Sequence, residues 1–287
     1  MGGGASPGGG KAPVLSGGAM SGRFDRDTRV EPLGEGRYRA RIDRGWWIVR
    51  GPNGGYVAAI LMRALEAAEG DPARSPRSLT VHYPRPPEEG EVEIETRVER
   101  RGRSVSFLSG RMTQQGRTVA LALAAFGAPR PGPEIRHAAP PAAIAVERAR
   151  PLPKGPASIP MRERFESRHA IGFPPGSGSV EMISGGWIRP EEPRPVDAPL
   201  LAAISDAWPP AIFARSRAGE PGNPVPTVDL TVHFRTSLPA REVPPGAFLL
   251  ARFRTRTVCE GFLEEDGEIY APDGRLLAQS RQLAVLL

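Results

Sequence analysis

The sequence is poor in several features that would indicate particular classes of protein. It has one cysteine, Cys259, in 287 residues, which excludes an internal disulfide and fits a reducing, cytoplasmic location. No apolar run approaches the ~18 residues of a membrane-spanning helix, because the longest covers only residues 56–62. Residues 1–22 are rich in glycine, alanine and serine without the apolar centre of a signal peptide, so we expect a disordered tail and no membrane partner.

Lysine is almost absent. Lys11 and Lys154 are the only two among 38 basic residues, and the remainder are arginines interleaved with acidic residues rather than clustered. The formal net charge of +6 therefore reflects a bias in composition, and nucleic acid is not the expected partner. Scattered arginines remain suited to phosphate groups on a small ligand.

Several familiar catalytic motifs are missing from the chain. It contains no Gly-x-Ser-x-Gly elbow and no Walker loop, and the glycine pattern that begins at Gly34 fails at Arg39. The four histidines do not have the spacing of metal ligands. We therefore predict neither a metal nor an organic cofactor.

A repeat is the most informative feature that is present. Residues 79–83 read Leu-Thr-Val-His-Tyr, and residues 230–234 read Leu-Thr-Val-His-Phe. A proline-rich turn, an alternating stretch, a Gly-Arg pair and a last apolar strand follow each copy. Self-similarity of this kind indicates a duplicated structural unit. His82 and His233 occupy equivalent positions, so a structural role in the strands is favoured for both.

Each half is predicted to contain one buried helix and an antiparallel sheet, an α+β arrangement. In the first half, residues 56–68 are apolar in almost every helical direction, which is typical of a helix buried on most sides. Apolar residues alternate with charged ones over 92–100, as in a strand with one wet face. The other strands expected there are 35–42, 78–83, 104–112 and 118–126.

The second half repeats this order. A helix is predicted from the N-cap Asp197 to Trp208, where two prolines end it. Its strands are expected at 164–169, 179–188, 227–235, 247–258, 262–271 and 275–287. The predicted domains are thus 23–128 and 161–287, joined by a proline-rich linker at 129–160.

Asp206 is the first candidate for chemistry. It is the only ionisable residue between Asp197 and Arg215, in the last turn of a predicted helix that is otherwise apolar. Desolvation and the helix dipole both disfavour a carboxylate there, so it needs a partner or a task. The alternative is a solvent-facing or turn-capping aspartate.

Gln282 and Thr227 are candidates because the two halves differ at these positions. By the repeat, Gln282 corresponds to Ala124 and Thr227 to Pro76. Duplicated halves often keep one functional site, so the polar members indicate where chemistry remains. Alternatively, Gln282 pairs with backbone at a sheet edge, and a threonine in a strand is common.

Asp206, Thr227 and Gln282, together with two halves of helix and meander, resemble the acyl-CoA thioesterase II (TesB-like) family of double hotdog proteins. The resemblance covers residues 23–128 and 161–287 and includes the Gly-Gly-Tyr segment at 54–56. It implies a tandem hotdog in which each half wraps a sheet around a helix.

The resemblance also implies hydrolysis of an acyl-CoA thioester by an activated water. Asp206 would be the base or its orienter, and Thr227 and Gln282 would position the water. Gly54, Gly55 and Tyr56 would bind the substrate, with backbone N–H groups of the two glycines as oxyanion donors. A tight turn before a packed helix is the alternative role for these glycines.

Two other functions remain open. One is a non-catalytic acyl-binding protein that keeps the fold without the activity. The other is a hydratase related to the MaoC type, whose Asp-x-Asn-x-x-His signature is absent here. Because exposed strand edges usually find a partner, we also expect the two halves to form a pseudo-dimer and the chain to form a homo-oligomer.

Overall fold

The computed structural model describes residues 22–154, 159–218 and 224–287, so all of the predicted tail except Gly22 lies outside the described residues. In the first half the strands are β1 (Glu31–Gly34), β2 (Arg37–Ile42), β3 (Ser75–His82), β4 (Gly90–Arg101), β5 (Val105–Gln114) and β6 (Arg117–Gly127). In the second half they are β7 (Arg150–Pro151), β8 (Phe165–Gly172), β9 (Ile183–Pro190), β10 (Thr227–Phe234), β11 (Leu249–Arg254), β12 (Val258–Cys259), β13 (Phe262–Tyr270) and β14 (Leu276–Val285). The helices are α1 (Arg23–Asp27), α2 (Gly54–Glu69) and α3 (Ala198–Ile204), with 3₁₀ turns η1 (Arg44–Trp46), η2 (Pro160–Arg164) and η3 (Ala211–Arg215).

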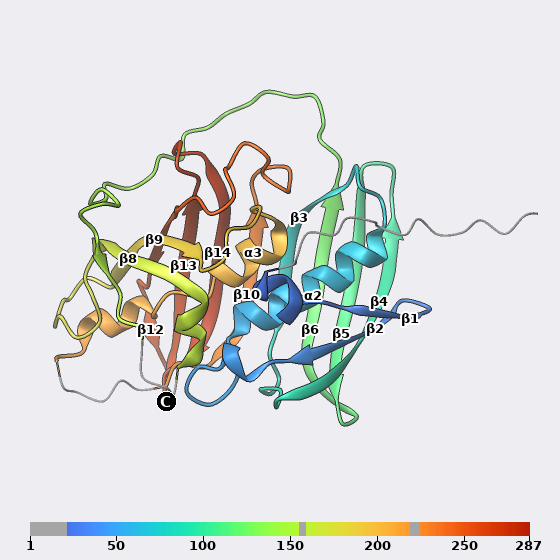
Figure 1. Ribbon diagram of the computed structural model, residues 1–287, viewed down its shortest axis with the longest axis horizontal. Coiled ribbons are helices and arrows are strands. Elements are labelled where there is room, and N and C mark those ends of the chain that lie inside the picture. Colours follow the sequence, from blue (N-terminus) through green and yellow to red (C-terminus); the bar gives the residue numbers. More distant parts are fainter. Residues whose placement is uncertain (1–21, 155–158, 219–223) are drawn as a thin grey trace, which may run out of the picture.

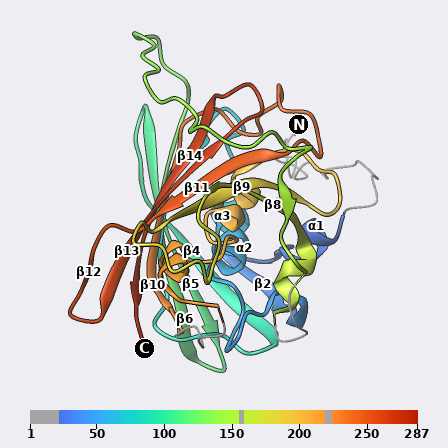
Figure 2. The ribbon, with the colours of Figure 1, turned by 90° about the vertical axis from the view of Figure 1, so that its left-hand side faces the viewer.

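All the described strands belong to one antiparallel sheet. Their order is β1-β2-β4-β5-β6-β3-β10-β14-β13-β11-β9-β8-β7, with β12 paired to β13. The alternation expected for a half-wet sheet is present, because Val92 and Ile94 of β4 are buried while Glu93 between them is exposed. The sheet curves around α2 and α3, which lie on its inner face (Figures 1 and 2).

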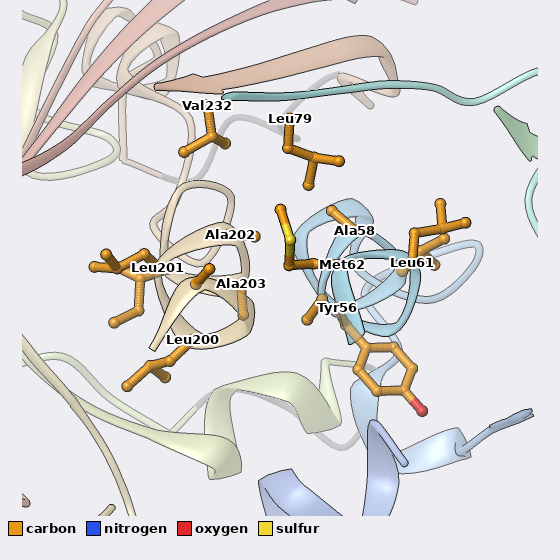
Figure 3. Packing of buried hydrophobic residues seen from close by; sticks show 14 of the residues in the cluster. Tyr56, Ala58, Leu61, Met62, Leu79, Leu200, Leu201, Ala202, Ala203 and Val232 are labelled. Atoms are coloured by element: carbon orange, nitrogen blue, oxygen red, sulfur yellow. The ribbon is translucent and has the colours of Figure 1, made fainter. Parts of the chain in front are cut away.

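The repeated pentapeptides pair with each other at the junction of the two halves. Strands β3 and β10 run antiparallel with Thr80 opposite Thr231, and the two hydroxyl oxygens lie 3.0 Å apart. On the inner face, Leu79 and Val232 point toward the two helices (Figure 3). The duplicated strands therefore join the halves into a continuous sheet.

The helices α2 and α3 pack closely against each other. Met62 of α2 lies between them, and Ala202 and Ala203 of α3 face it (Figure 3). A Cβ added to Gly55 would lie 2.6 Å from the carbonyl oxygen of Ala203. Small residues thus let the start of α2 meet the end of α3.

Helix α3 ends at Ile204, which corrects the prediction that it continues to Trp208. The Ser205 hydroxyl donates to the carbonyl of Leu201 at 2.8 Å, and the next two amides bond three residues back, as at a tightening helix terminus. Asp206 therefore lies in the turn that follows α3, beside the first turn of α2. No helix in the described residues is long and apolar enough to cross a membrane.

Candidate active site

The carboxylate of Asp206 is bound at the beginning of α2. Its Oδ2 accepts hydrogen bonds from the backbone N–H of Gly55 at 3.0 Å and from Nδ2 of Asn53 at 2.9 Å. The same Nδ2 donates to the backbone oxygen of Asp206 at 2.6 Å. Two residues that are 153 positions apart in the chain are thus held in one arrangement.

Asn53 has this role because it is the N-cap of α2. Its Oδ1 accepts from the backbone N–H of Tyr56 at 3.0 Å, as N-cap side chains do. The amide can then present only its Nδ2 to Asp206, and the residue is 3% exposed. Capping therefore fixes the donor that orients the carboxylate.

Burial raises the pKa of Asp206 to about 6, and the backbone N–H groups of Gly55 and Gly54 and the amide of Asn53 oppose that rise. A carboxylate with such a pKa is ionised at neutral pH and is still basic enough to take a proton from water. These are the properties of a general base.

Tyr83 connects this carboxylate to the start of β10. Its hydroxyl donates to the carbonyl of Gly54 at 2.9 Å, and its backbone N–H donates to Val228 at 3.0 Å. Burial raises the pKa of Tyr83, and the carboxylates of Asp206 and Asp229 raise it further. The phenol is therefore neutral and serves as a hydrogen-bond donor.

Thr227 and Gln282, both predicted from the sequence, are in direct contact. The Thr227 hydroxyl donates to Oε1 of Gln282 at 3.2 Å, across the ladder in which Leu230 is opposite Gln282. Nε2 of Gln282 donates to Oε1 of Glu265 at 3.1 Å. The structure thus brings the predicted pair together and adds a glutamate behind it.

Glu265 connects this pair to the segment that carries Asp206. Its Oε2 accepts from the backbone N–H of Ala211 at 2.5 Å, five residues after Asp206. Burial raises the pKa of Glu265, and the charge of Asp206 adds to the rise. Hydrogen bonds through Glu265 thus connect the Thr227–Gln282 pair to the segment that follows Asp206.

Two domain families match the chain along most of its length. Residues 43–127 match the acyl-CoA thioesterase N-terminal domain, and residues 139–286 match the acyl-CoA thioesterase C-terminal domain. The chain belongs to the acyl-CoA thioesterase family.

Solved structures agree with this membership. A hot dog fold protein of unknown function from Alicyclobacillus acidocaldarius has a TM-score of 0.84 and 26% identity, over 93% of this chain and 99% of that one. A candidate thioesterase II from Thermobifida fusca has a TM-score of 0.78 and 29% identity, over 94% and 100%. The first of these likenesses identifies the hotdog fold, and the second is to a thioesterase II.

More distant relatives share the fold or the overall length. An acyl-CoA thioesterase II from Mycobacterium marinum has a TM-score of 0.73 at 20% identity, over 92% of this chain and 98% of that one, which shows a common fold. An uncharacterized protein from Mycobacterium tuberculosis is 24% identical over 275 residues, covering 87% of this chain and 90% of its own length.

Gly54 and Gly55 of this family member lie at the site, in a different role from the one predicted. The N–H of Gly55 donates to Asp206, so in this structure it stabilises the carboxylate rather than standing free for an oxyanion. A Cβ on Gly54 would come 3.0 Å from Oδ2 of Asp206. Both glycines are therefore required to be small beside the carboxylate.

The Tyr56 side chain contacts aromatic and backbone groups of the core. It is fully buried, points away from α3 (Figure 3) and stacks on Trp46 with ring centroids 4.7 Å apart. Its hydroxyl donates to the carbonyl of Asp27 at 2.7 Å. The side chain packs in the core, and only its backbone N–H is near the site.

The opposite end of the helix pair is filled by ion pairs. The N-cap of α3, Asp197, accepts from Arg194 at 2.8 and 2.6 Å. Arg194 also binds Asp25 at 2.9 Å, and Asp25 binds Arg63 of α2. Burial, and then Asp197, raise the pKa of Glu66 to about 7. The start of α3 is thus closed by charged side chains, whereas the start of α2 holds Asp206.

No group of three or more histidine, cysteine, aspartate or glutamate side chains placed to hold a metal ion occurs in the described part of the chain.

Proposed function

We propose that the protein hydrolyses an acyl-CoA thioester to the free acid and CoA with a water activated at Asp206. The observation that carries the proposal is the Asp206 carboxylate, bound by Asn53 and Gly55, with the Thr227–Gln282 pair on the neighbouring strands. Family membership supports the substrate class.

The reaction can be written with these groups. Asp206 takes a proton as the water oxygen attacks the thioester carbon, and a tetrahedral oxyanion forms. Collapse of the oxyanion breaks the C–S bond, and the CoA sulfur leaves and receives the proton held by Asp206. The Thr227 hydroxyl has given its hydrogen to Gln282, so its oxygen can accept a hydrogen from the water. The second hydrogen on Nε2 of Gln282 remains to donate to the water oxygen or the oxyanion.

The proposal includes the finer organisation of the molecule. Residues 23–128 and 161–287 form a tandem hotdog in which each half supplies a helix, and 129–160 connects them. The chain acts in the cytoplasm without nucleic acid or membrane partners and forms a homo-oligomer. Sedimentation that gives only the monomer mass would contradict the last point.

Release of free thiol from a panel of acyl-CoAs, from short to long chains, tests the function. We expect release from at least one chain length, with saturation kinetics. An acyl-CoA that binds tightly while no member of the panel is hydrolysed would instead indicate a non-catalytic acyl-binding protein.

The pH dependence of kcat/KM is expected to follow Asp206. A base must be ionised to act, and burial raises the pKa of Asp206 to about 6, so kcat/KM should fall about tenfold per pH unit below pH 6. Initial rates in buffers of constant ionic strength from pH 4.5 to 7.5 measure this limb. A rate that does not change between pH 5 and 7 would remove Asp206 as the base.

Substitution of Asn53 is expected to shift the fall of kcat/KM at low pH to higher pH. The Asn53 amide hydrogen bond lowers the pKa of Asp206, so its loss leaves the burial effect less opposed. In Asn53→Ala the helix cap is lost as well, which costs about 1 kcal/mol of stability. Asn53→Ser is the matched control, because a serine can still cap α2 and offers no amide donor.

Both Asn53 variants should therefore show the shifted limb, and only Asn53→Ala should unfold at a lower temperature. pH–rate profiles and thermal denaturation separate the two effects. If the pH–rate profile of the serine variant matches that of the wild type, Asn53 only caps α2 and does not influence the pKa of Asp206.

A further inference from the structure

Glu265 is a buried glutamate without a cationic partner. It lies on β13 and is 4% exposed, and no salt bridge to it is formed among the described residues. Both of its carboxylate oxygens accept from N–H groups, one from Ala211 and one from Gln282. Burying a carboxylate costs folding free energy unless a cation pairs with it. A role for the two hydrogen bonds of Glu265 is therefore expected.

These two contacts determine how the Gln282 amide is oriented. The N–H of Ala211 can only donate, so it occupies Oε2 of Glu265. Oε1 then faces Gln282 and, as a carboxylate oxygen, accepts from Nε2 and not from Oε1 of the amide. Oε1 of Gln282 is thereby directed to the hydroxyl of Thr227.

We propose that Glu265 is a positioning residue for hydrolysis, which holds the Gln282 amide with its oxygen at Thr227 and its second Nε2 hydrogen free for the water or the oxyanion. The proposal rests on the proposed function. Glu265 itself reaches no reacting atom and acts only through Gln282.

The electrostatics of Glu265 are set by its burial and by these contacts. Burial raises its pKa to about 8, the N–H of Ala211 and the amide of Gln282 oppose this, and the carboxylates of Asp206 and Glu264 add to it. The ionised form is the one that accepts from both donors, so the orienting contact described here belongs to that form, and the effect of Glu265 on kcat should be larger at pH 8 than at pH 7.

The test is Glu265→Gln, which keeps the shape and changes the hydrogen bonding. The oxygen of the new amide must face the N–H of Ala211, which leaves its NH₂ facing Gln282. Two NH₂ groups cannot bond to each other, so Gln282 must turn and present Nε2 to Thr227. We expect kcat to fall about tenfold, the effect of one charge-assisted hydrogen bond, while KM changes less than about twofold.

A double-mutant cycle with Gln282→Ala decides whether Glu265 acts through Gln282. In the Gln282→Ala background, Glu265→Gln should change kcat by less than about twofold. Glu264→Gln is the matched control, because the neighbouring Glu264 binds backbone N–H groups of Arg256 and Thr257 on the strand's other side. It should leave kcat unchanged.

Three results would overturn the proposal: wild-type kcat in Glu265→Gln, the same fold loss with and without Gln282, or an unfolding temperature low enough to account for the lost activity. These outcomes differ from failure of the proposed function, in which the wild-type chain itself releases no thiol from any acyl-CoA.

Discussion

Asp206→Asn is expected to lose kcat by a factor of ~10²–10⁴, the range for removal of a general base. The substituted side chain still offers an oxygen to the N–H of Gly55 and to Asn53, which bind Asp206 in the wild type. It cannot take a proton from water. Thiol release at saturating acyl-CoA measures the loss, and binding of the substrate should persist.

The same substitution should leave the fold at least as stable. Burial raises the pKa of Asp206 to about 6 from its usual value of 3.8, so the folded state favours the neutral form, and stability falls as the pH rises from about 4 to 6 and the carboxylate ionises. An amide removes that penalty, and the unfolding temperature at pH 7 should stay equal or rise. Asp273→Asn, in an exposed turn, is the control and should change neither property. If kcat of Asp206→Asn stays within twofold of wild type, the proposed mechanism is wrong.

Gln282→Ala should show the second largest effect, a loss of ~10²–10³ in kcat, as for removal of a donor to a developing oxyanion. The truncation removes Nε2 and leaves the hydroxyl of Thr227 without the acceptor that it has in the wild type. Since the amide acts on the water and the oxyanion, KM should change little.

Gln279→Ala is the matched control for Gln282→Ala. It lies on the same strand, three residues earlier, and accepts from Arg235 on the outer face, so its truncation should preserve kcat. A loss of equal size in both variants would indicate damage to β14 rather than to the chemistry. Steady-state kinetics and the unfolding temperatures of the two variants distinguish these cases.

Much of the fold was accessible from the sequence because its signals are local. The repeated pentapeptide and period-two alternation predicted β3, β10 and β4 within a few residues. The predicted C-terminal end of α3 was wrong. The proline pair at 209–210 sets the last position that a helix could reach, and α3 ends before it. The Ser205 hydroxyl and two tightened backbone bonds end it at Ile204.

Part of the candidate site could be recognised in the sequence, for physical reasons that can be named. Asp206, Gln282 and Thr227 were identifiable as polar groups in apolar or asymmetric positions. Glu265 was hidden among acidic neighbours that suggest a wet strand, although the phase of β13, with Leu263 buried two residues before it, places it inside. Asn53 was recognisable as a cap before Gly54, but its contact with Asp206 depends on tertiary structure.

The ion-paired cluster at the start of α3 bears on the number of active sites expected in each chain. Arg194, Asp25 and Asp197 form ion pairs at the start of α3, whereas the candidate site lies at the start of α2. Under the proposed function, each polypeptide therefore carries one turnover centre. Active-site titration should accordingly give a stoichiometry of one per 30.8 kDa chain, so an assembly of several subunits carries as many centres as polypeptides.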